Sequence, residues 1–103
     1  MSRNKLCFSI FSMSLMLLLS GEANAVDVEA GRVLATRCAM CHGVDGEGVG
    51  IPKSVLAGMD VHRFKEIIND YKTGERRNYM MEKFTKNLSE QDVENLAAFY
   101  ASK

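Results

Sequence analysis

The chain has 103 residues, of which 25% are charged, and its basic and acidic side chains are equal in number at 13 each. These values are typical of one small soluble globular domain and argue against a disordered chain. The sequence contains no block of basic residues, so it does not favour nucleic acid or another polyanion as a partner.

The N-terminal segment has the features of a secretory signal peptide. Arg3 and Lys5 give it a positive start, LCFSIFSMSLMLLLS is almost entirely apolar, and Ala23 and Ala25 form a small-residue cleavage site. The apolar run is shorter than the roughly 20 residues that span a bilayer as a helix, so an uncleaved membrane anchor is the weaker interpretation. We therefore predict cleavage after Ala25, export to the periplasm, and a mature domain at residues 26–103 without a membrane span.

Cleavage also decides how many cysteines remain. Cys7 is lost with the signal peptide, which leaves Cys38 and Cys41 in an oxidising compartment. A disulfide between two cysteines three residues apart would cross-link only a short stretch of chain and would stabilise the fold little. A domain this small often needs a metal, disulfides or a large cofactor for stability, so the sequence favours a buried prosthetic group.

We predict an all-α domain of three main helices with loops wrapped around a cofactor. The first helix is expected from Val28 to about Arg37. The stretch GVDGEGVGIPKSVLAG contains five glycines and the single proline, so it is expected to form a long loop. A loop of this length is uncommon in a small domain unless it surrounds something functional.

The second helix is expected from Val61 to Lys72, with Asp60 as its N-cap and Gly74 as its stop. One face carries an apolar stripe with the spacing of a buried helical face, made by Phe64, Ile67, Ile68 and Tyr71. We interpret this stripe as ordinary core, and that core can include a cofactor.

The last part of the mature chain divides into two segments. ERRNYMMEKFTKN is polar and is expected to be irregular, with two methionines at its centre. SEQDVENLAAFYAS is expected to be the third helix, because Ser89 and Asp92 approximate a capping box and apolar residues then recur at helical spacing.

The stretch CAMCH, from Cys38 to His42, carries the strongest functional signal. Residues i and i+3 share one side of a helical turn, so two thiols can form thioethers with the two vinyl groups of one haem. The adjacent His42 can then supply an axial imidazole, and C-x-x-C-H is the signature of c-type haem attachment. A zinc site needs about four ligands, and a thioredoxin-like site needs a βαβ context that is absent, so both are weaker. We predict one covalently bound haem c.

The other face of the haem has several candidate ligands. A methionine opposite a histidine raises the potential and suits an electron carrier. Met80 and Met81 lie where a loop can cross that face, whereas Met59 comes early and His62 is interpreted as an exposed residue at a helix start. The alternative from another class is a five-coordinate haem that binds small molecules or acts as a peroxidase.

With CAMCHG near the mature N-terminus, a methionine beyond it and LSEQDVENLAAF in the last helix, the sequence resembles the class I c-type cytochromes over essentially the whole mature chain. The resemblance implies a small helical domain wrapped around haem, in which the first and last helices cross. It also implies that Gly31 lies against Phe99 or Leu96.

The stretches CHGVDGEG, IPKSVLAGM and YKTGERRNYMMEKFTKNLSEQD are similar to those of cytochrome c4-type domains and of the haem subunit of flavocytochrome c sulfide dehydrogenase. In such domains the ligand methionine stands seven residues before the leucine of LS, which selects Met81, with Met80 as the runner-up. The resemblance further implies that the Pro52 carbonyl accepts a hydrogen bond from the histidine ligand, and that Arg76 lies near a haem propionate.

The function implied by this resemblance is one-electron transfer, and the chain is not expected to be an enzyme by itself. Its implied partner is the flavoprotein subunit of a sulfide dehydrogenase, from which it would accept electrons. The alternative is a free soluble periplasmic carrier between respiratory or photosynthetic complexes. Many of the similar proteins carry two haems, whereas this sequence has one C-x-x-C-H.

Overall fold

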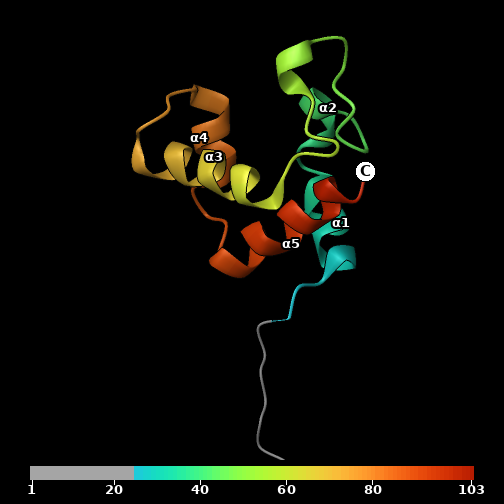
Figure 1. The fold of residues 1–103 in the computed structure, drawn as a ribbon. Helices are drawn as coiled ribbons and strands as arrows, with labels where there is room; N and C mark the ends of the chain where they lie inside the picture. The colour runs from blue at the N-terminus through green and yellow to red at the C-terminus, as the bar shows by residue number, and fades with distance from the viewer. Residues whose placement is uncertain (1–24) are drawn as a thin grey trace, which may run out of the picture.

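A computed structural model describes residues 25–103, and every regular element in this range is a helix (Figure 1). The predicted all-α class is confirmed. The predicted signal peptide falls almost wholly outside the described residues. No helix in the described range is long and apolar enough to cross a membrane. The elements in chain order are α1 Val28–Ala35, α2 Ala39–His42, the short 3-10 turn η2 Pro52–Ser54, α3 Val61–Thr73, α4 Tyr79–Thr85 and α5 Glu90–Ala101.

Helices α1 and α5 pack against each other at Gly31, as the resemblance implies. A β-carbon at Gly31 would lie 2.1 Å from the backbone oxygen of Asn95 and 3.1 Å from the β-carbon of Phe99. Only glycine allows two backbones to approach this closely. The side-chain oxygen of Asn95 also accepts a hydrogen bond of 2.9 Å from the backbone N–H of Asp27, which ties the start of α1 to α5.

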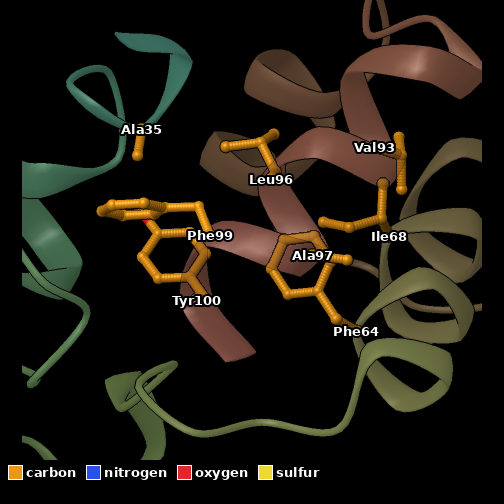
Figure 2. Close-up of a cluster of buried hydrophobic side chains, with 8 residues drawn as sticks. All are labelled: Ala35, Phe64, Ile68, Val93, Leu96, Ala97, Phe99 and Tyr100. Carbon is orange, nitrogen blue, oxygen red and sulfur yellow. The ribbon is translucent and has the colours of Figure 1, made fainter. Parts of the chain in front are cut away.

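The hydrophobic core runs along α5, between α1 on one side and α3 on the other (Figure 2). Phe64 and Ile68 of α3 face α5, while Ala35 lies near the Phe99 side of the cluster. The ring of Tyr100 lies 5.7 Å from that of Phe64 and 5.0 Å from that of Phe99. These three rings are in continuous contact, and they connect α5 to α3 across the core.

The ends of α3 and α5 follow the predicted signals. The Asp60 side chain accepts a hydrogen bond from the backbone N–H of Arg63, and α3 ends at Gly74, which has a φ of 91°. Ser89 and Asp92 form a complete capping box at the start of α5. Helix α1 is shorter than predicted and ends at Ala35 rather than near Arg37.

The prediction of an irregular segment before α5 is wrong, because Met80 and Met81 lie on helix α4. The Asn78 side chain caps this helix by accepting a hydrogen bond of 3.0 Å from the backbone N–H of Met81. The Glu82 carboxylate accepts in return from the backbone N–H of Asn78 at 2.8 Å and pairs with Arg77 at 3.1 Å. These two hydrogen bonds, the one from Arg77 foremost, lower the pKa of Glu82.

The predicted loop between α2 and α3 is closed at its base against α5. The carbonyl of Gly46 accepts hydrogen bonds from the backbone N–H groups of Leu56, at 2.7 Å, and Ala57, at 2.9 Å. The next amide, that of Gly58, donates to the carbonyl of Tyr100 at 2.8 Å. Gly46 has a φ of 79°, and a β-carbon there would lie 2.7 Å from the Tyr100 ring. The loop therefore has a defined path over the last helix.

Candidate functional site

A cavity of about 390 Å³ opens among α1, α2, α3, α4 and α5, and its wall is mainly apolar. Its volume lies in the range typical of small-molecule and cofactor sites. The four predicted site residues, Cys38, Cys41, His42 and Met81, all line it. They come from segments about forty residues apart, so the fold brings the two halves of the predicted site to one space.

The two cysteines stand at the start and near the end of the short helix α2. Cys38 is the N-cap residue of that helix and Cys41 belongs to it, so the three-residue spacing places both at one helical turn, as predicted. Cys38 is partly buried and Cys41 is exposed, and both have free thiols. Burial raises the pKa of the Cys38 thiol.

His42 is oriented by Ser54 rather than by Pro52, which corrects the expectation from the resemblance. Its Nδ1 lies 2.7 Å from the Ser54 carbonyl oxygen. Because a carbonyl can only accept, Nδ1 carries the proton and donates, which leaves the lone pair on Nε2 for a metal. Ser54 is itself fixed, since its backbone N–H and its hydroxyl both donate to the Ile51 carbonyl, at 2.8 and 2.7 Å.

Helix α3 supplies one apolar wall of the cavity. All four residues of its predicted stripe, Phe64, Ile67, Ile68 and Tyr71, line the space. Phe64 and Ile68 belong to the buried core as well. The stripe therefore contributes to the core and to the cavity wall at the same time.

The candidate ligands for the side of the cavity opposite His42 differ in burial. Met80 and Met81 both line the cavity, but Met80 is 46% exposed, whereas Met81 is partly buried and packs against the core. Met59 also lines the cavity and packs against the core. His62 is exposed and lies outside the lining, as its predicted place at a helix start suggests.

Three buried polar atoms of the cavity lining have no hydrogen-bond partner within the described residues: Arg76 Nε, Thr85 Oγ1 and the Tyr100 hydroxyl. Burial, and then the nearby Cys38 thiol, raise the pKa of Tyr100. A buried donor without an acceptor is costly, which indicates that a bound group supplies acceptors here. Arg76 was expected near a carboxylate of that group. Tyr100 belongs to the predicted apolar face of the last helix, whereas Thr85 was not singled out from the sequence, because its burial depends on helices distant in the chain.

These features fit a covalently attached haem. The apolar walls suit a macrocycle, the paired thiols of one helical turn suit two vinyl groups, and His42 offers a nitrogen whose orientation is fixed. The partnerless donors suit the carboxylates and ligand atoms that such a group brings.

Comparison with known proteins gives a consistent family. A family model described as Cytochrome c matches residues 28–102. Cytochrome c4 of Pseudomonas aeruginosa is 37% identical over 94 residues, covering 90% of this chain and 47% of the relative. The thiosulfate dehydrogenase electron acceptor of Stutzerimonas stutzeri is 33% identical, covering 80% of this chain and 41% of the relative. Cytochrome c-554(548) of Halomonas halodenitrificans is 31% identical, covering 76% of this chain and 98% of the relative. The chain thus spans about half the length of the first two relatives.

Proposed function

This chain belongs to the cytochrome c family, a family of electron-transfer proteins with covalently bound haem c, and from this premise we propose that it transfers single electrons through a haem held by Cys38, Cys41, His42 and Met81. The observation that supports the proposal is that one apolar cavity is lined by all four of these side chains. When bound, haem supplies an iron that cycles between two oxidation states.

The protein residues hold and insulate that group. Cys38 and Cys41 fix its position through two thioethers. His42 presents Nε2, because the Ser54 carbonyl holds Nδ1 at 2.7 Å. The α3 stripe and the core residues beside it give the cavity an apolar wall, which limits solvent access to a bound haem and thereby influences its potential.

Met81 is the proposed sixth ligand, and Met80 provides the matched control. Both lie on α4, but Met81 is the one that packs against the core. We expect oxidised protein to show the weak far-red iron–sulfur band. Met81→Leu should lose the band and acquire a high-spin spectrum, whereas Met80→Leu should keep it. Wild-type protein with a high-spin spectrum and rapid carbon monoxide uptake would refute His/Met ligation and favour the five-coordinate alternative.

Two settings fit this role equally. In one, the chain is the haem subunit of a flavocytochrome c sulfide dehydrogenase and accepts electrons from the flavoprotein subunit that oxidises sulfide. In the other, it is a free carrier between respiratory or photosynthetic complexes. Affinity purification of the chain expressed with its native neighbours separates them. A co-purifying flavoprotein and sulfide-dependent haem reduction support the subunit, whereas a partner-free monomer reduced by a quinol-oxidising complex supports the carrier.

We also propose that residues 1–25 direct export to the periplasm and are then removed, which leaves residues 26–103 as one haem domain. The mass of the exported protein tests this. It should equal the peptide from Val26 onward plus one haem, and the haem should remain attached after denaturation. A mass that retains the N-terminal segment would refute cleavage at Ala25.

A further inference from the structure

The hydroxyl of Thr85 is a buried donor for which residues 25–103 supply no partner. Thr85 is 2% exposed, stands at the end of α4 and lines the cavity. Threonine in a helix commonly donates to the carbonyl three or four residues earlier, and this bond is not formed here. The hydroxyl is therefore free to serve something that occupies the cavity.

The position of Thr85 along α4 makes Met81 a candidate acceptor. Met81 is four residues earlier, and side chains four apart lie on the same helical face. Because the Cα–Cβ bonds of a helix tilt toward its N-terminus, the Thr85 side chain leans back over the turn that carries Met81. Both side chains also line the same cavity.

A haem carboxylate is the competing acceptor, and the guanidinium of Arg76 is the stronger donor for one because it carries a charge. Arg76 has a buried Nε without a partner in the described chain, and it precedes the start of α4. From Tyr79 to Thr85 the helix rises about 9 Å. Arg76 thus lies before the start of α4 and Thr85 at its end, and Met81 is the candidate acceptor one turn from the threonine.

We propose that Thr85 donates a hydrogen bond to the thioether sulfur of Met81 when that sulfur ligates the iron, and thereby raises the reduction potential. This rests on the proposed His/Met ligation. A thioether sulfur is a weak acceptor that keeps a lone pair after binding a metal. A donor there withdraws electron density, and the oxidised iron depends on that density more than the reduced iron. The hydrogen bond therefore favours the reduced state, and Thr85 is a positioning and tuning residue.

The test compares Thr85→Val, which keeps the shape and removes the hydroxyl, with Thr85→Ser, which keeps the hydroxyl. Thr73→Val is the control, because Thr73 is exposed and its hydroxyl bonds the Asp70 carbonyl within α3. We expect Thr85→Val to shift the redox equilibrium toward the oxidised form by about three- to tenfold, where tenfold is about 59 mV for one electron. The far-red band should remain and change position, and Thr85→Ser should restore both values toward those of the unmodified protein.

Other results overturn the proposal while leaving the ligation intact. If Thr85→Val matches Thr73→Val in potential and band position, the hydroxyl has no effect on the iron. If serine and valine shift the potential equally, the effect comes from packing. A potential shift with an unmoved far-red band, and with a changed pH dependence, would assign the hydroxyl to a haem carboxylate. Absence of the band in unmodified protein would refute the Met81 ligation itself, so the two failures are distinguishable.

Discussion

Replacing Gly31 by alanine should weaken the contact between the first and last helices. The added β-carbon would stand 2.1 Å from the Asn95 oxygen and 2.6 Å from the Asn95 carbonyl carbon, where ordinary contact begins at 3.4 Å. Both atoms belong to the α5 backbone, so no side-chain rotation can relieve the clash. Helices α1 and α5 must then separate by roughly 1 Å, which a close-packed interior resists.

Two opposing terms set the size of the effect. Alanine is favoured over glycine in a helix interior by about 1 kcal/mol, which stabilises α1. Overpacking of a tight contact costs about 1–3 kcal/mol, and a clash with backbone belongs at the upper end. Separation also strains the hydrogen bond between Asp27 and Asn95. We expect a net loss of about 1–2 kcal/mol in the free energy of unfolding.

Urea unfolding of the haem-loaded protein, followed by far-ultraviolet circular dichroism and by haem absorbance, measures this loss. The midpoint should fall by about 1 M with an unchanged slope. Ala30→Gly is the control on the same helix, since it removes helix propensity at a partly exposed position without adding an atom. If Gly31→Ala is as stable as the unmodified protein or more stable, the close approach of α1 and α5 does not constrain this position.

Four further outcomes are expected. Ser54→Ala removes the hydrogen bond from the hydroxyl to the Ile51 carbonyl, so the free energy of unfolding should fall by about 1 kcal/mol. The reduction potential of the haem-loaded protein should also shift, because the Ser54 carbonyl holds His42. Ser102→Ala, near the C-terminus, is the control. Asn95→Leu leaves the backbone N–H of Asp27 without its acceptor, and the free energy of unfolding measured in urea should fall by about 1–3 kcal/mol. No change would show that water accepts this hydrogen bond in place of the Asn95 side chain. Ser89→Ala breaks the capping box and should cost about 1 kcal/mol, with a smaller loss for Ser89→Asn by the same assay. Cys38→Ala with Cys41→Ala prevents attachment, so the cavity should collapse and circular dichroism should show lost helix and a broadened thermal transition; a sharp transition would show that the fold does not need the haem.

Regular hydrophobic spacing made α3 and α5 predictable from sequence, because their apolar residues recur with the helical period and their caps are local. Helix α4 has little such spacing, and its segment is polar around two adjacent methionines, so the sequence predicted an irregular segment there. Its one local signal is the pair Asn78 and Glu82, whose reciprocal hydrogen bonds cap the helix.

The cavity could be predicted only in part. The motif CAMCH predicts three of the proposed haem-holding side chains, two as thioether anchors and one as an iron ligand, since their spacing is local. The acceptor for His42 depends on how the glycine-rich loop turns, and that path brings the Ser54 carbonyl to the ring instead of the Pro52 carbonyl. Likewise, the burial of Thr85 results from helix packing between distant segments, which no local pattern reports, whereas helical spacing already places Tyr100 on the apolar face of the last helix.

The closure of the loop against α5 links two parts of the molecule that the chain keeps far apart. Gly58 donates to the Tyr100 carbonyl, and the Gly46 carbonyl holds Leu56 and Ala57, within the same loop that presents Ser54 to His42. Opening the loop therefore requires release from the last helix. The environment of His42 and the C-terminal turn should therefore form one cooperative unit, whose amide protons exchange with solvent together rather than by separate local fraying.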